Sequence, residues 1–178
     1  SARLVTGTNT ITNSGTISAE SSIGVDLRNA TGVTLENSGT ISSAGQYGIN
    51  ADNAFSPTIT NSGTISASVS EANGIGINLA QNDAENLGSG ATITNSGTIQ
   101  GHGSRRAIHI QDHGTETGTT IKLSGEPTFT NGIELGKTIT NIVLQNDITG
   151  DLTVEIYNYD GDLTITNELS GNDTYTLT

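Results

Sequence analysis

The sequence predicts an all-β fold, a parallel β-helix in which the chain winds once for each repeat unit. One nine-residue string recurs along the chain in nearly identical form. The 20 isoleucines fall at constant places in these repeats, alternating with polar residues as in a strand with one buried face. No stretch shows the apolar spacing of an amphipathic helix. Fixed-period self-similarity of this kind is typical of solenoids.

The repeat consists of two recognisable pieces. The first is TITNSGTIS, which begins at Thr10 and returns at 34–42, 58–66 and 92–100, so that its asparagines are 24, 24 and 34 residues apart. The second follows each copy, as GVDL at 24–27, GINA at 48–51, GINL at 76–79 and AIHI at 107–110. Weaker copies continue toward Thr178, which gives about seven units.

Each unit contains three short strands. In TIT the isoleucine points to one face and both threonines to the other, and the NSG that follows is a turn. TIS forms a second strand of the same polarity. After a Gly/Ser-rich corner, GVDL forms the third, with Val25 and Leu27 inward and Asp26 outward.

Identical units favour stacking of each strand on its own copy, in parallel and in register. About seven coils then follow at a spacing of about 4.8 Å. Equivalent side chains lie above one another, so a ladder of stacked amides is expected at the corner. Its members are Asn13, Asn37, Asn61 and Asn95.

We expect residues 1–178 to form a single β-helix domain, with regular coils at about 8–111 and less regular, acidic coils at about 120–178. The last 41 residues contain seven acidic groups and no Lys or Arg. Extra length between repeats predicts protruding loops at 66–73, 81–90 and 101–119. Loops on a rigid scaffold often carry function.

Composition excludes several classes of partner. The net charge is −12 and Lys and Arg together number six, which disfavours nucleic acid. No apolar run is long enough to cross a bilayer, so we expect no direct membrane insertion of this segment. The absence of cysteine excludes disulfides. A hydrophobic content of 31% would suit a disordered chain, but the repeat concentrates it into a thin core.

The TITNSGTISA repeats followed by a G(I/V)(N/D)L strand resemble the passenger domains of Gram-negative autotransporters, most clearly over residues 8–111. This resemblance implies a right-handed β-helix in an extracellular segment of a longer passenger, displayed at the bacterial outer membrane. It implies a non-enzymatic adhesin or self-association stem. The expected partners are a host-cell surface receptor or glycan, or the same protein on neighbouring cells. The matching positions form coils, so no binding residue is carried over.

Candidate binding residues come instead from the loops and outward faces, with the densest ionisable group at 102–116. A metal or acid/base role for His109, Asp112 and His113 competes with a simpler interpretation, in which His109 is an outward strand residue stacked with Asn50 and Asn78 and with Glu134. Zinc needs three or four ligands in defined geometry, so we expect no metal and no cofactor. The candidate binding residues are Asn73, Asn82, Asp83, Glu85, Arg105, Arg106, His109, Asp112 and His113.

Two alternative functions remain open. A carbohydrate-processing enzyme would need paired carboxylates, which outward Asp and Glu of adjacent coils could supply, but the chain has no Trp for sugar stacking. An ice-binding face would use paired threonines, which Glu36 and Lys122 interrupt. The pairs are Thr10/Thr12, Thr58/Thr60, Thr92/Thr94, Thr138/Thr140 and Thr164/Thr166. Because the chain has no Trp for sugar stacking, we expect no enzymatic activity. For the C-terminal aspartates, a solvated surface is favoured over calcium binding.

Overall fold

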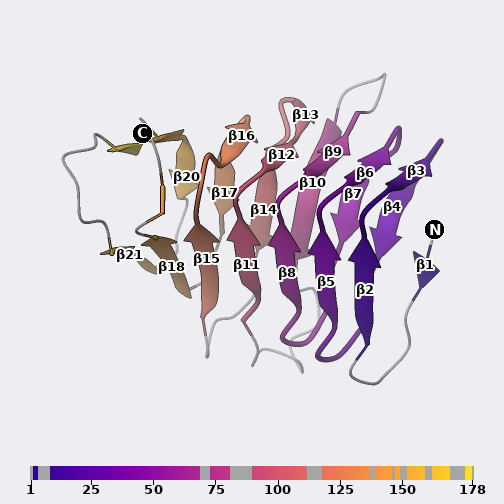
Figure 1. Cartoon of the computed structure of the whole chain (residues 1–178), viewed down its shortest axis with the longest axis horizontal. Helices are drawn as coiled ribbons and strands as arrows, with labels where there is room; N and C mark the ends of the chain where they lie inside the picture. Colours follow the sequence, from indigo (N-terminus) through magenta and orange to yellow (C-terminus); the bar gives the residue numbers. More distant parts are fainter. Residues whose placement is uncertain are drawn as a thin grey trace.

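The chain is an all-β parallel solenoid of about five turns with three strands per turn, and its described residues include no helix (Figure 1). The computed structural model describes residues 2–3, 9–68, 73–80, 90–111, 118–136, 139–145, 147–148, 152–158, 162–168 and 175–177. Side chains are described for these residues apart from 2–3, 73, 158, 167 and 175–177.

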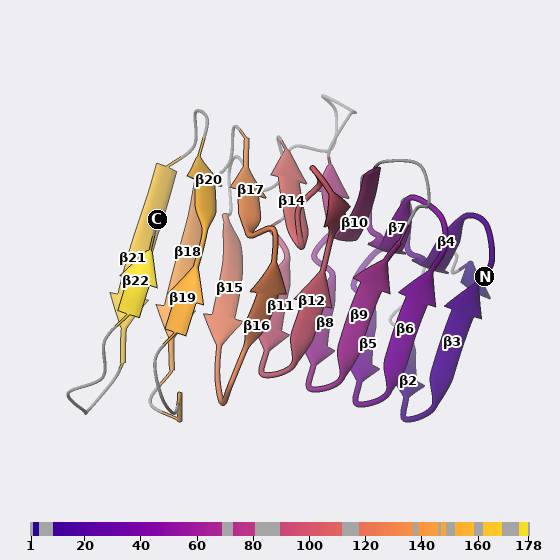
Figure 2. The ribbon, with the colours of Figure 1, turned by 90° about the horizontal axis from the view of Figure 1, so that it is seen from above.

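Three sheets run along the rod, one for each strand of the repeat (Figure 2). Sheet A contains β1 (Ala2–Arg3), β4 (Ile23–Asp26), β7 (Tyr47–Asn50), β10 (Asn73–Ala80), β14 (Ile108–Gln111), β17 (Ile133–Leu135) and β20 (Ile156–Asn158), and β13 (His102–Gly103) pairs antiparallel with β10. Sheet B contains β2 (Thr10–Asn13), β5 (Thr34–Asn37), β8 (Thr58–Asn61), β11 (Thr92–Asn95), β15 (Thr119–Leu123), β18 (Ile139–Leu144) and β21 (Asp162–Asn167). Sheet C contains β3 (Thr16–Ala19), β6 (Thr40–Ser43), β9 (Thr64–Ala67), β12 (Thr98–Gln100) and β16 (Thr128–Thr130). A separate pair joins β19 (Leu152–Val154) to β22 (Tyr175–Leu177).

The register confirms that strands stack on their own copies. In sheet B, Ile59 pairs with Leu35 on one side and with Ile93 on the other. In sheet C, Ile65 lies between Ile41 and Ile99 in the same way. The stacked isoleucines point inward and are fully buried, so the three sheets enclose one continuous apolar core.

A column of glycines in sheet A brings two walls of this core close together. A Cβ on Gly48 would lie 2.7 Å from the carbonyl oxygen of Gly76 and 3.0 Å from Cγ2 of Ile65. Gly24 and Gly76 occupy the same place in the neighbouring coils and are equally crowded. The interior is therefore too narrow here for any side chain unless the coils move apart.

The four corner asparagines form a ladder. Nδ2 of Asn13 donates to Oδ1 of Asn37, Asn37 donates to Asn61, and Asn61 donates to Asn95, each at 2.8 Å. The amides of Asn13, Asn37 and Asn61 also donate to a threonine carbonyl of the next coil, at 3.0 to 3.2 Å. Leu123 follows Asn95 in register, so the ladder ends there.

The register of β18 corrects one expectation. The string TITN at 138–141 is not the structural equivalent of the earlier copies, because Ile142 pairs with Ile121 and Leu144 with Leu123. Thr140 is buried beside Thr119, so it does not belong to the outward threonine array. The observed register is shifted by three residues from the one that would align the TIT string with its earlier copies. It places Ile142 and Leu144 in the core, and the burial of these two large apolar side chains outweighs the alignment of the string.

The loop boundaries also differ from expectation. Ser66 and Ala67 belong to β9, and Asn73 is the first residue of β10, paired with Gly103. Within 101–119, β13 forms an added strand. Most of the predicted loops 66–73 and 81–90 lies outside the described residues.

Replacing Asn61 with alanine should lower the free energy of unfolding by about 2–3 kcal/mol, because the fully buried amides of Asn37 and Asn95 each lose a partner. Urea unfolding followed by circular dichroism measures the change. Ser14→Ala, at an exposed turn residue, is the control and should unfold like the parent protein. An Asn61→Ala protein as stable as the parent would show that the ladder does not stabilise the fold.

Gly48→Ala should destabilise the protein by about 1–3 kcal/mol, the usual cost of forcing a methyl group into a closely packed interior. Gly15→Ala is the matched control, since a Cβ there has no neighbour within 4 Å. The same urea experiment compares them. Equal stability of the two variants would contradict the crowding inferred at the glycine column.

Candidate functional site

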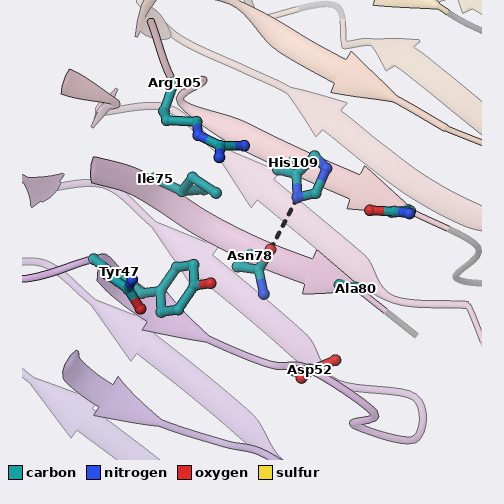
Figure 3. Close-up of a pocket in the computed structure, with 9 residues that line it drawn as sticks. Tyr47, Asp52, Ile75, Asn78, Ala80, Arg105 and His109 are labelled. Atoms are coloured by element: carbon teal, nitrogen blue, oxygen red, sulfur yellow. Dashed lines mark hydrogen bonds between the residues drawn. The ribbon is translucent and has the colours of Figure 1, made fainter. Parts of the chain in front are cut away.

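A pocket of about 270 Å³ lies on the outer face of sheet A, over three successive coils (Figure 3). Tyr47 opens β7 and Asp52 follows it, Asn78 comes from β10, and His109 comes from β14. Arg105 enters from the segment that leads into β14. Strand stacking thus brings together residues that are up to 65 positions apart in the chain.

The floor of the pocket is a second polar ladder. Nδ2 of Asn78 donates to Oδ1 of Asn50 at 3.0 Å, and Oδ1 of Asn78 lies 3.0 Å from Nδ1 of His109. Glu134 follows His109 in register, with 3.7 Å between Oε1 and Nε2. The stacking of His109 with Asn50, Asn78 and Glu134 is therefore confirmed. Both asparagines are 4% exposed although they lie on the outer face.

These contacts determine the state of the imidazole. Because Asn78 presents its carbonyl oxygen, Nδ1 of His109 carries the proton and donates it. Burial lowers the pKa of His109; Glu134 raises it and Arg105 lowers it further, and the net direction is downward. His109 is therefore neutral at pH 7, with an unprotonated Nε2.

Arg106 contacts Glu134 and Tyr157 beside the pocket. Its Nε lies 3.4 Å from Oε2 of Glu134, and its guanidinium carbon lies 3.5 Å from the centre of the Tyr157 ring. Stacking on an aromatic face and pairing with a carboxylate are the contacts that guanidinium groups favour. Arg106 thus holds the Glu134 carboxylate in place and does not line the pocket.

Arg105 differs from Arg106 in its surroundings. Its backbone is anchored by Asn131, whose Nδ2 donates to the carbonyls of Gly103 and Arg105 at 3.1 Å each. Its exposed side chain extends toward His109 in Figure 3 and makes no ion pair with the described part of the chain. A cation on an anchored loop therefore faces the pocket.

The remaining lining mixes apolar and hydrogen-bonding groups. Tyr47 and Ile75 pair in register and form an apolar wall. The amides of Gln46 and Gln111 and the carboxylate of Asp52 supply donors and acceptors. Asp52 is the one carboxylate among the described lining residues, and its backbone N donates to Oδ1 of Asn50 at 3.2 Å. Such a lining suits recognition of a small polar molecule.

Only some of the predicted site residues are found at the pocket. Arg105 and His109 meet in the pocket, and Arg106 lies next to it. The side chain of Asn73 is not described, and the remaining predictions lie outside the described residues: Asn82, Asp83, Glu85, Asp112 and His113. Sequence reasoning missed Tyr47, Ile75 and Asp52, although aligning the units places Tyr47 and Ile75 at one column position.

Other candidate surfaces have a defined geometry as well. On sheet B, the threonines at the first outward position form an unbroken column, Thr10, Thr34, Thr58, Thr92 and Thr120. In the second column, Thr12, Thr60 and Thr94 are interrupted by Glu36 and Lys122. Within the described ranges, no three His, Asp or Glu side chains gather as metal ligands would.

The described residues contain no helix of the length and apolarity that a membrane crossing requires. Comparisons with known protein families, curated proteins and solved structures return no match to this chain.

The lowered pKa of His109 predicts a pH-dependent stability. As pH falls through the ordinary histidine pKa of 6.5, the unfolded chain takes up more protons than the folded one, so the folded state loses stability, by at most about 1.4 kcal/mol per pH unit. His109→Asn removes this contribution and keeps the ladder, because the new amide can donate to Asn78 as Asn78 donates to Asn50. Urea unfolding from pH 8 to pH 5 should show a smaller loss for the variant, and parallel curves would contradict the assignment.

Proposed function

We propose that this protein is a non-enzymatic adhesin or self-association stem, displayed outside the cell on the bacterial outer membrane. We further propose that its coils wind right-handedly and number about seven once the less regular C-terminal region is included. Its partner is a receptor or glycan on a host cell, or the same protein on a neighbouring cell.

The pocket on sheet A supports this proposal most directly. Its floor is a ladder of side chains from adjacent coils, and Asn131 anchors the loop that carries Arg105. A preformed recess with a few oriented polar groups on a rigid scaffold suits recognition without rearrangement. The described lining residues include one carboxylate, where most glycosidases use a pair, which favours binding over hydrolysis.

The repeated outer faces provide a second kind of contact. Threonine hydroxyls recur from β2 to β15 along sheet B, and threonines of β3, β6, β9, β12 and β16 do so along sheet C. Each hydrogen bond to such a hydroxyl contributes only a little affinity, but contacts repeated along a rod add together. Specificity would then come from the pocket and avidity from the faces.

Tyr47→Ala should reduce binding of the fluorescently labelled protein to host cells, or to cells that display it, several-fold. The change removes the aromatic wall of the pocket. Flow cytometry measures binding, and urea unfolding checks that the variant is folded. Phe55→Ala is the matched control: Phe55 is 44% exposed and does not line the pocket, so binding should stay at the parental level.

Absence of binding to both kinds of cell would contradict the proposed function, and release of sugars from a glycan by the purified protein would favour the enzymatic alternative. Ice binding would be favoured by thermal hysteresis above that of an albumin control. Equal binding by the Tyr47→Ala and parent proteins would show that the pocket does not determine binding specificity.

A further inference from the structure

The charges of the pocket are separated in space. The guanidinium of Arg105 lies at one end and the carboxylate of Asp52 at the other, as Figure 3 shows. Arg105 precedes β14 whereas Asp52 follows β7, and β10 lies between these two strands. The two strand spacings between β7 and β14 alone amount to about 10 Å. A ligand that uses both groups needs an anionic end and a hydrogen-bond donor several ångströms from it.

Arg105 is the group suited to bind the anionic end. Arg28 is paired with Asp26, Arg106 with Glu134, and Lys122 lies on sheet B. A guanidinium binds a carboxylate through two parallel N–H···O contacts, which gives direction as well as attraction. The neutral imidazole of His109 adds no positive charge beside it.

The middle and far end of the pocket suit a hydroxylated ring. Tyr47 and Ile75 present apolar surface against which the C–H face of a ring can pack. The amides of Gln46 and Gln111 can donate to and accept from hydroxyl groups, and Asp52 accepts from them. A volume of about 270 Å³ lies just below the usual range for drug-sized ligands, so it accommodates one small ring.

We propose that the pocket binds one carboxylate-bearing sugar residue, with its carboxylate on Arg105, its ring against Tyr47 and its hydroxyls toward Asp52. The inference rests on the proposed adhesive function and names the ligand class for the same site. The α-ammonium and α-carboxylate of a free amino acid are attached to one carbon, so this pair of groups cannot reach both ends. A neutral hexose offers no counter-charge to Arg105.

The test compares two probes that differ only in the carboxylate, methyl β-glucuronide and methyl β-glucoside. Titration of the ¹⁵N-labelled protein, followed by NMR, should show the glucuronide binding at least about tenfold more tightly, the value of one hydrogen-bonded charge pair. The resonances that shift should include Tyr47 and His109. Sodium acetate serves as the probe for a carboxylate without a ring and should bind at least tenfold more weakly.

Arg105→Gln should weaken glucuronide binding by about tenfold or more and leave glucoside binding unchanged. Arg105→Lys should give an intermediate affinity, because it keeps the charge and loses the two-pronged contact. Lys122→Gln is the matched control: it changes the net charge by the same amount on sheet B, away from the pocket, and should bind like the parent protein.

Equal affinity for the two glycosides, or equal loss in the Arg105→Gln and Lys122→Gln proteins, would overturn the role of the carboxylate. Acetate binding as tight as glucuronide binding would overturn the proposal that the ligand is a sugar. Cell binding by the parent protein without glucuronide binding would refute this inference and leave the adhesive function intact. Absence of cell binding together with glucuronide binding would refute the function and keep the ligand class.

Discussion

The structure depends on one constraint, that each residue of a coil lies directly above its counterpart in the coil before. Parallel in-register stacking makes every side-chain position a column, and a column is stable only if its members tolerate their own kind as neighbours. Isoleucine does so by packing in the core, glycine by leaving room, and asparagine by donating an amide hydrogen to the carbonyl oxygen of the next asparagine. The composition, rich in a few residue types, follows from this requirement.

The same constraint explains how the pocket is built. One column of sheet A reads Asn50, Asn78, His109 and Glu134 along the rod, so a structural ladder changes into ionisable groups within two coils. Asn50 orients Asn78 and Asn78 orients His109, which explains why the imidazole has a defined tautomer. The rim is formed where the coils depart from uniformity, at Tyr47, Asp52 and Arg105.

Repetition also determined what could be predicted from the sequence. The three-strand coil, the stacked columns and the asparagine ladder follow from identical strings at regular spacing. The register of β18 does not, because the string at 138–141 matches the repeat while Ile142 and Leu144 fill the core. The pocket was only partly visible: Arg105 and His109 stood out as ionisable residues of one dense segment, whereas Tyr47 and Asp52 become neighbours of His109 only through stacking.

The asparagine ladder has a mechanical consequence for a protein under tension. Its hydrogen bonds connect one coil to the next, as do those between strands, so both run along the rod axis. A pull on the two ends therefore loads the junctions between coils, and a yielding coil of 24 residues would release about 80 Å of chain. A rod pulled in this way would lengthen in steps, and each step would dissipate work.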